Sequence, residues 1–452
     1  MNKLILGKEQ QEAFDSIINF IKSSINIAYS LEGAAGTGKT TVLNTLLDWI
    51  EDNTMLYALC APTHKAALVM KQLTGRNANT LHSLLALTPN VDVLNLDLRE
   101  LQFRTSRVQS NIPTNGIVIC DEASMINDDL FDLLIEKVSM RNSKIIFVGD
   151  SAQLLPVKQI RCSKVYNLDD KYKLTKIYRQ SEKNSIGPVL ERLRSTEIQN
   201  FITCKGEEGS LIVDSDLKSF FEKAIKEIKI GIESKNILHT KIAAYTNKRV
   251  ELYNEAVRKH LFNNSNEYNP GDILTAYENG EYDGTQYYNS MDYIVIDVRE
   301  YTKELPNFGP ISGFILKLWD PFFEGIFEIF ILSKENSENV FNNLASTIEH
   351  IRLQAIDAKS KKLKTSYRYW RKYYDLINSF ASPIDLYFDN RVVRKKSFDY
   401  GYAMTVHRLQ GSSYNNIFVD MRNIKTCKDD LVRRQLQYVA LSRTRTNAYI
   451  LQ

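Results

Sequence analysis

The sequence has no apolar run close to the roughly 20 residues that a membrane-spanning helix needs, and it lacks the apolar segment of a signal peptide. Its five cysteines lie far apart without a C-x-x-C pair, which argues against a zinc site or a disulfide framework. Neither sign of charge dominates, because 58 basic residues face 54 acidic ones, so any basic surface must be local. We expect a soluble cytoplasmic protein without membrane contact. Its 452 residues suggest about three domains.

One glycine-rich stretch carries a phosphate-binding pattern. Residues 31–41 read LEGAAGTGKTT and fit the P-loop pattern G-x-x-x-x-G-K-[ST]. Its glycines allow backbone N–H groups to close around phosphate oxygens at the positive end of a following helix. Lys39 supplies a charge for the β- and γ-phosphates, and Thr40 supplies a hydroxyl for Mg²⁺. An apolar run over 27–31 and helical spacing over 41–50 favour a nucleoside triphosphate site over a chance glycine-rich turn.

Acidic and amide side chains that suit the same site come later in the chain. The apolar run 117–120 ends in Asp121 and Glu122. Asp121 is expected to hold Mg²⁺, and Glu122 to polarise the attacking water, whereas a structural acidic pair is the alternative. Gln153 follows another apolar run, where its amide would contact the γ-phosphate. Gln10 has an amide that suits an adenine edge, although taken alone it reads as an ordinary exposed glutamine.

The spacing of apolar runs predicts an α/β fold. Two halves rich in βα units imply two stacked parallel sheets with a cleft between them. Alternating apolar residues between 87 and 113 suggest a small hairpin excursion, with a plain surface insertion as the alternative. Short β-like runs after residue 261 suggest a small β-barrel, followed by one long helical stretch over about 335–380. Basic and aromatic residues over 359–374 suit a nucleic-acid strand, but we favour a core of the insert's own aromatics with a charged wet face.

These motifs together resemble superfamily 1 helicases of the RecD-like 5′→3′ branch, and within that branch the Dda group of T-even phages. The matching stretches follow the family order across nearly the whole chain: 33–41, 61–67, 80–83, 121–125, 149–156, 178–179, 244–248, 405–411 and 438–443. The resemblance implies two tandem RecA-like parallel-sheet domains, 1A (1–86 and 114–185) and 2A (186–260 and 397–452). It also implies a pin insertion 1B (87–113) and a domain 2B (261–396) with an SH3-like β-barrel and a helical tower.

The resemblance also implies the site residues. Arg179 and Arg443 would be arginine fingers that reach the γ-phosphate from the two sides of the cleft, and they join Lys39, Asp121, Glu122 and Gln153 as the catalytic set. Thr40 and Asp121 would bind the metal. The residues implied to bind the nucleotide are Gln10, Gly33, Ala35, Gly36, Thr37, Gly38, Lys39, Thr40, Thr41, Gln410 and Gly411. Those implied to line the DNA track are Pro62, Thr63, His64, Thr80, His82, Asn247, Thr405 and His407.

Two positions depart from the family pattern. Many RecD-like proteins carry Glu at the position of Ser413, whereas the Dda group has Ser there, as this chain does. The pin segment has no obvious aromatic residue at its tip, and Phe103 is the nearest candidate. We expect an ATP- and Mg²⁺-dependent 5′→3′ DNA helicase of phage-type replication, recombination or repair. Its expected partners are single-stranded and forked DNA, a single-stranded-DNA-binding protein or replisome components, and we expect a monomer.

Other readings of the motifs are less specific. An RNA helicase of the same superfamily and a DNA-stimulated P-loop translocase without strand separation stay open. A clamp loader or recombinase would take its arginine finger from a neighbouring subunit, whereas Arg443 lies in the same chain after a second α/β unit.

Overall fold

A parallel six-stranded sheet forms the N-terminal half of the computed structural model, which describes residues 6–89, 103–105, 110–156, 159, 161–177, 184–264, 266–282, 284–363, 365–381, 383–388 and 391–452. Its strand order is β3-β2-β6-β7-β1-β8. The strands are β1 (Ala28–Gly33), β2 (Tyr57–Ala61), β3 (Ala78–Thr80), β6 (Ile117–Cys120), β7 (Lys144–Gly149) and β8 (Lys171–Leu174). The helices of this half are α1 (Lys8–Lys22), α2 (Lys39–Asp52), α3 (His64–Thr74), α4 (Leu81–Leu84) and α5 (Asp128–Met140), with 3₁₀ turns at Ala123–Met125 and Lys164–Asn167.

Strand alternation explains why this sheet is covered on both faces. In β6, Ile117 and Ile119 pack with the apolar sides of α1 and α2, whereas Val118 and Cys120 pack with α5. Successive side chains of a strand point to opposite faces, so an unbroken apolar run needs a layer on each side. Cys60 and Cys120 are fully buried core residues, and all five cysteines are free thiols.

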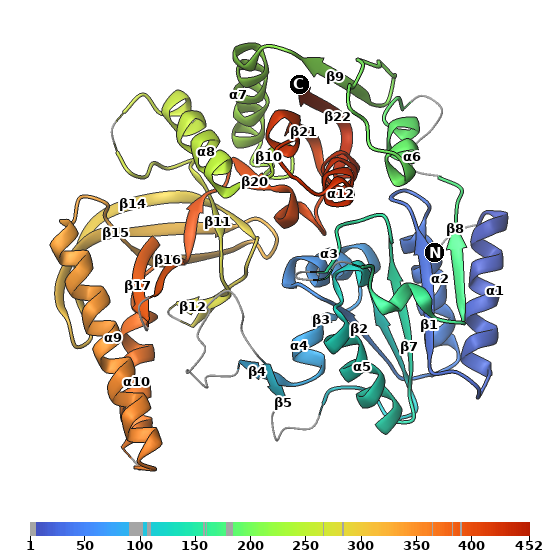
Figure 1. The fold of residues 1–452 in the computed structure, drawn as a ribbon, viewed down its shortest axis with the longest axis horizontal. Helices are drawn as coiled ribbons and strands as arrows, with labels where there is room; N and C mark the ends of the chain where they lie inside the picture. Colours follow the sequence, from blue (N-terminus) through green and yellow to red (C-terminus); the bar gives the residue numbers. More distant parts are fainter. Residues whose placement is uncertain are drawn as a thin grey trace.

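A second parallel sheet forms the other half, with the strand order β20-β10-β21-β22-β9. Its strands are β9 (Ser210–Asp214), β10 (Thr240–Ala244), β20 (Ala403–Thr405), β21 (Tyr414–Asp420) and β22 (Thr444–Leu451). Its helices are α6 (Gly187–Ser195), α7 (Leu217–Glu233), α8 (Asn247–Leu261), α11 (Met421–Ile424) and α12 (Asp430–Ser442), with a 3₁₀ turn at Val406–Leu409. The α/β fold with two parallel sheets is therefore confirmed (Figure 1).

The chain leaves the second sheet after α8 and returns to it at β20. Between them lies a five-stranded antiparallel sheet with the order β16-β15-β14-β11-β19. Its strands are β11 (Ile273–Ala276), β14 (Asp292–Leu305), β15 (Gly309–Asp320), β16 (Gly325–Leu332) and β19 (Phe398–Tyr400); the hairpins are β12 (Gly280–Tyr282) with β13 (Thr285–Tyr287) and β17 (Pro383–Phe388) with β18 (Arg391–Lys396). Closure of this sheet into a barrel stays a prediction.

The expected helical stretch is present, and it consists of two helices, α9 (Glu338–Ser360) and α10 (Ser366–Ile377). The chain turns after α9, where Lys362 has a φ of 53°, and α10 packs back on α9 through apolar residues of both helices. The pair projects from the antiparallel sheet (Figure 1). Tyr373 is buried in this core, as the favoured interpretation requires, whereas the side chain of Tyr367 is 72% exposed.

The expected hairpin excursion in the first half is present at its base. Strands β4 (Leu87–Pro89) and β5 (Phe103–Thr105) pair in antiparallel register. The predicted tip between them lies outside the described residues. Within the described part of the chain, no helix combines the length and apolar character needed to cross a bilayer.

Candidate nucleotide and nucleic-acid sites

The P-loop joins the end of β1 to the start of α2. Gly36 and Gly38 have φ angles of 88° and 83°, in the left-handed region that glycine adopts without strain. A Cβ atom on Gly38 would lie 2.0 Å from Nε2 of Gln10, so a larger residue does not fit there. The loop therefore turns tightly at the positive end of a 14-residue helix, which is the geometry of an anion site.

Lys39 lies inside this loop. Its Nζ donates hydrogen bonds to the carbonyl oxygens of Gly33 at 2.7 Å and Ala34 at 3.0 Å. Burial lowers the pKa of Lys39, while the carboxylates of Asp150, Asp121 and Glu122 oppose that shift. The carboxylates thus offset part of the cost of burying a positive charge at this position.

Two residues of the predicted nucleotide set serve the loop itself. Thr37 is fully buried, and its hydroxyl donates to the Ala34 carbonyl at 2.9 Å. Gln10 is 4% exposed, donates from Nε2 to the Thr37 carbonyl at 3.2 Å, and accepts the Gly7 N–H at 3.0 Å. The reading of Gln10 as an ordinary exposed glutamine is therefore wrong, because α1 packs this side chain against the P-loop.

The acidic pair follows β6, whose carboxyl end lies at the same edge of the sheet as that of β1. Asp121 accepts the Glu122 N–H at 2.8 Å, and Glu122 has a φ of 52°, which is uncommon for residues other than glycine. Burial and the charge of Glu122 raise the pKa of Asp121 to about 6. A nearby cation would favour its charged form.

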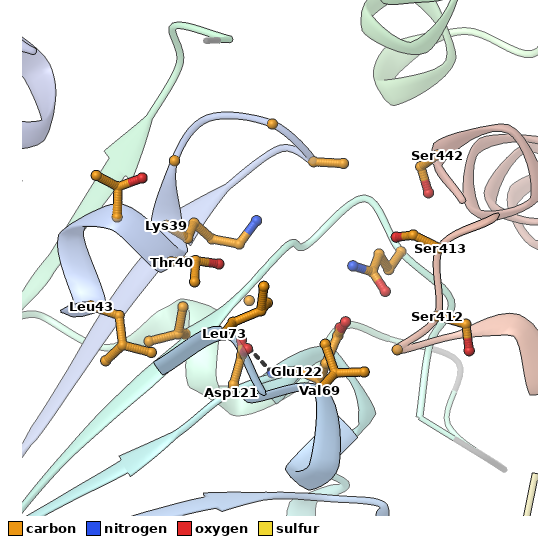
Figure 2. Close-up of a pocket in the computed structure, with 18 of the residues that line it drawn as sticks. Lys39, Thr40, Leu43, Val69, Leu73, Asp121, Glu122, Ser412, Ser413 and Ser442 are labelled. Carbon is orange, nitrogen blue, oxygen red and sulfur yellow. Dashed lines mark hydrogen bonds between the residues drawn. The ribbon is translucent and has the colours of Figure 1, made fainter. Parts of the chain in front are cut away.

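A cavity of about 340 Å³ lies between the two halves. Its first wall holds Gln10, Ala35, Gly36, Gly38, Lys39, Thr40, Thr41, Asp121, Glu122 and Gln153. The second wall holds Gly411, Ser412, Ser413, Ser442 and Arg443. Figure 2 shows Lys39 and Thr40 on one side and the three serines on the other. The walls also include the apolar side chains of Leu43, Val69, Leu73 and Val148, so the cavity suits a small ligand that has both polar and apolar parts.

Arg443 enters the cavity from the end of α12. It is 6% exposed, its Nη1 lies 3.9 Å from Oε1 of Glu122, and Nε and Nη2 donate to the Ser442 hydroxyl at 3.2 and 3.1 Å. The predicted cation of the second half and the predicted water-orienting carboxylate of the first half therefore meet in one space. Gln153, 6% exposed, has a buried Oε1 without a hydrogen-bond partner in the described structure, so its amide is available to a ligand.

These residues fit a nucleoside triphosphate with Mg²⁺. The described residues contain no cluster of three or more His, Cys, Asp or Glu side chains that would hold a metal by itself. Mg²⁺ needs no such cluster, because it is commonly held by one or two protein oxygens together with phosphates and water. Thr40 and Asp121 line the same cavity and can provide those oxygens.

The predicted DNA-track residues lie mainly at the carboxyl ends of edge strands. Pro62, Thr63 and His64 follow β2, Thr80 ends β3 and His82 lies in α4 after it. Asn247 begins α8 after β10, Thr405 ends β20, and His407 lies in the 3₁₀ turn after it. Strands β2 and β3 are at one edge of the first sheet, and β10 and β20 are at one edge of the second. The two sheets thus present these residues away from the P-loop strand.

The sequence does not predict contacts between α3 and the insert, the segment between α8 and β20. The rings of His64 and Tyr288 stack with centroids 4.5 Å apart. Lys65, 3% exposed, donates to the Ser290 carbonyl at 2.9 Å and to the Tyr414 hydroxyl at 3.5 Å. One turn of α3 therefore contacts both the insert and the second sheet. Sequence offered no signal for these pairs, since the partners are more than 200 positions away.

Three of the predicted nucleotide-binding residues, Gly33, Thr37 and Gln410, do not line the cavity. Arg179 falls outside the described residues. Gly33 ends β1 behind the loop, and Gln410 is half-buried beside Gly411 with an Nε2 atom that has no partner in the described structure. The serines at 412, 413 and 442 line the cavity but were missed, because serine is common in ordinary loops.

Two protein families match segments of this chain. The AAA domain family matches residues 5–215, and the UvrD-like helicase C-terminal domain family matches residues 400–451. The first segment contains the P-loop and the acidic pair, and the second contains Gly411 and Arg443.

Curated relatives and solved structures extend this likeness. The chain is 24% identical to the ATP-dependent DNA helicase dda of Enterobacteria phage T4 over 98% of both chains. It is 34% identical to the ATP-dependent RecD2 DNA helicase of Deinococcus radiodurans over 34% of this chain and 20% of the relative. Bacteroides Pif1 bound to ssDNA has a similar fold, with a TM-score of 0.51 and 17% identity over 99% of this chain and 92% of that chain. A structure describing DNA unwinding at forked dsDNA by two Pif1 helicases gives a TM-score of 0.53 and 17% identity over the same shares.

Proposed function

Because this chain belongs to superfamily 1B of the helicases, close to the Dda group, and is an ATP-dependent DNA helicase of that type, we propose that it translocates 5′→3′ on single-stranded DNA and separates duplex ahead of it. The cavity between the halves is the observation that carries the proposal. Its walls bring Lys39, Glu122 and Arg443 together from two sheets. A ligand that contacts both walls favours closure of the halves, and loss of those contacts favours opening.

Each side chain has a distinct task in this proposal. ATP bound with Mg²⁺ supplies the phosphoanhydride bond that is hydrolysed. Lys39 and the loop N–H groups hold the phosphates, and Thr40 and Asp121 provide oxygen ligands for the metal. Glu122 orients the attacking water through its carboxylate. Gln153 contacts the γ-phosphate through its amide, and hydrolysis removes that contact. Arg443 stabilises charge on the phosphoryl group from the second half, as we propose for Arg179 from the first.

DNA contacts at the carboxyl ends of β2, β3, β10 and β20 would convert the cycle of ATP binding and hydrolysis into movement of the protein along the strand. Pro62, His64 and His82 would grip the strand from the first half, and Asn247, Thr405 and His407 from the second. Burial, together with the nearby His82, lowers the pKa of His64, so at neutral pH the ring is suited to stacking rather than to carrying charge. Alternate gripping by two halves moves the protein along a strand with little sequence preference, because phosphate contacts and stacking are shared by all bases.

The predicted domain bounds belong to this proposal. We assign domain 1A to 1–86 and 114–185, the pin to 87–113, domain 2A to 186–260 and 397–452, and domain 2B to 261–396. Single-stranded and forked DNA are the proposed substrates. A single-stranded-DNA-binding protein or replisome components as partners, a monomeric state and a cytoplasmic location stay predictions.

ATP turnover with single-stranded DNA, compared with RNA of matched sequence and length, tests this function. We expect DNA to stimulate turnover and RNA to do so weakly. Equal stimulation by RNA would indicate the RNA helicase alternative. Turnover that neither polymer changes would contradict the proposed coupling between the nucleotide and the nucleic acid.

A further inference from the structure

Asp150 is a buried carboxylate between the two halves. It follows β7 in the first half and is fully buried. Its Oδ1 accepts from Nη1 of Arg194 at 2.8 Å and from the N–H of Ala152 at 3.1 Å, and its Oδ2 accepts from the Tyr438 hydroxyl at 2.5 Å. A buried charge is costly unless it is paired and hydrogen-bonded. Arg194 and Tyr438, the side chains that donate to Asp150 in the described structure, therefore both come from the second half.

Arg194 and Tyr438 come from α6 and α12, two helices that pack against each other in the core of the second half. Leu190 and Leu193 of α6 share an apolar cluster with Leu436 of α12. The segment after α6 is tied to α12 as well, since Gln437 accepts the Ile198 N–H at 3.2 Å and donates to its carbonyl at 3.1 Å. Both side chains that hold Asp150 thus move with the second sheet.

The same two side chains also reach the P-loop. The Tyr438 hydroxyl accepts from the Ala35 N–H at 3.5 Å and from Nη1 of Arg194 at 3.2 Å. Nη2 of Arg194 lies 3.8 Å from Oε1 of Glu32, which directly precedes the first glycine of the loop. Burial and the charge of Asp150 raise the pKa of Tyr438 well above its usual range, so its hydroxyl keeps the proton that it donates to Asp150.

The loop that begins at Asp150 carries the residue predicted to contact the γ-phosphate. The Gln153 N–H donates to the Asp150 carbonyl at 3.1 Å, and the next residue, Leu154, is buried in the core of the second half. Gln153 is therefore held between two first-half residues that contact the second half: Asp150, which accepts from Arg194 and Tyr438, and Leu154, which packs in the core of that half. A shift of α6 and α12 relative to the first sheet would act directly on Gln153 and Ala35.

We propose that Arg194 and Tyr438 are positioning residues that couple the nucleotide cavity to the second half through Asp150. The proposal rests on the proposed function, since coupling has meaning only if DNA stimulates hydrolysis. Neither side chain needs to touch the nucleotide. They set the position of the Gln153 loop and of the Ala35 N–H, and that position depends on how the two halves are arranged. A DNA strand bound by both halves fixes their arrangement and so changes the rate of ATP turnover.

Conservative substitutions test this coupling. Tyr438→Phe removes one hydroxyl, and Arg194→Gln removes the cation. Arg192→Gln, on the exposed face of the same helix, is the matched control. We would measure kcat and KM for ATP with and without single-stranded DNA, the affinity for a fluorescent ATP analogue, and the melting temperature. For both variants we expect stimulation of kcat by DNA to fall about tenfold or more while analogue affinity changes less than about threefold, and Arg192→Gln to match the wild type.

The double variant decides whether the residues act as one unit. Tyr438→Phe with Arg194→Gln should lose no more stimulation than the worse single variant, because interacting residues are non-additive. Stimulation within about twofold of the wild type in both single variants would overturn the proposal, as would additive losses. A lower melting temperature with normal stimulation of kcat by DNA would show that Arg194 and Tyr438 only stabilise the fold, which would also overturn the proposal. A wild type that DNA does not stimulate would overturn the proposed function itself, and the coupling with it.

Discussion

Lys39 and Glu122 face one cavity but differ in what they offer a ligand. The ammonium of Lys39 is held on loop carbonyls at the anion-binding end of α2. The Glu122 carboxylate lies beside Asp121 and near Arg443. Binding and chemistry should therefore separate when the two residues are changed one at a time.

Lys39→Ala should abolish ATP turnover together with tight nucleotide binding, because it removes the phosphate-binding charge. Glu122→Gln should abolish turnover but retain ATP binding, since the amide keeps the shape and loses the water-orienting charge. DNA-stimulated turnover and binding of a fluorescent ATP analogue, measured on both variants, check this. Near wild-type turnover in Glu122→Gln would remove the residue from its proposed role.

Lys65 is a buried cation whose pKa predicts a pH effect on stability. Burial is the main cause that lowers its pKa to about 8, and Asp292 opposes the shift. In the unfolded chain its pKa would be about 10.4, so between these values the unfolded state binds more protons and stability rises with pH. The Lys65→Met variant has no amine at this position and so lacks this pH dependence of stability.

The free energy of unfolding of the wild type, relative to Lys65→Met, should therefore rise by about 2 kcal/mol between pH 7.5 and pH 9.5. Urea titrations of both proteins at the two pH values measure it. A difference that stays constant or falls across this range would show that the Lys65 amine keeps an ordinary pKa in the folded protein.

At the scale of elements, strand ends and helix starts coincide. Thr63 caps α3 by accepting the Ala66 N–H at 3.1 Å, and Thr80 caps α4 by accepting the Ser83 N–H at 3.2 Å. These caps end β2 and β3 at the edge where DNA residues are proposed. The Thr63 cap fixes the start of the helix that carries His64.

Thr63→Ala should lower the free energy of unfolding by about 1 kcal/mol, the usual cost of losing an N-cap, whereas Thr63→Ser should retain it. Chemical denaturation of the two variants compares them directly. Equal stability of the alanine and serine variants would mean that the cap contributes nothing measurable to α3.

Local patterns predicted the elements well because they depend on neighbours in sequence. The strand before the P-loop, the helix after it and the apolar run before Asp121 all have the expected type. Contacts between distant segments were not readable from these patterns. The sequence around Gln10 does not reveal that α1 packs this side chain on the P-loop. Nothing in the sequence around Arg194 indicates its contact with Asp150, because only the fold brings α6 to that residue. The break between α9 and α10 depends on packing of one helix against the other.

In the whole molecule, residues from both halves line the cavity that we propose binds ATP. Arg443 is the cation that the second half brings to Glu122. Arginine fingers in phosphoryl transfer contribute about 10³–10⁵ in rate. Changing the second-half residue Arg443 should therefore impair hydrolysis and leave ligand binding in place.

Arg443→Ala should lose DNA-stimulated turnover while nucleotide and DNA binding persist, and Arg445→Ala, exposed two residues later, should behave as the wild type. Steady-state turnover and equilibrium binding of both ligands check this. Hydrolysis that survives within about tenfold would make Arg443 a structural cation.

Unwinding of duplexes with one single-stranded tail tests the central claim most directly. The large insert interrupts the second half, and the hairpin base at β4 and β5 interrupts the first, an arrangement that resembles the 5′→3′ branch. We predict unwinding of a duplex with a 5′ tail, little unwinding with a 3′ tail, and none without ATP and Mg²⁺, with added salt weakening loading. Preference for the 3′ tail would contradict the proposed direction, and failure with both tails despite DNA-stimulated hydrolysis would contradict strand separation.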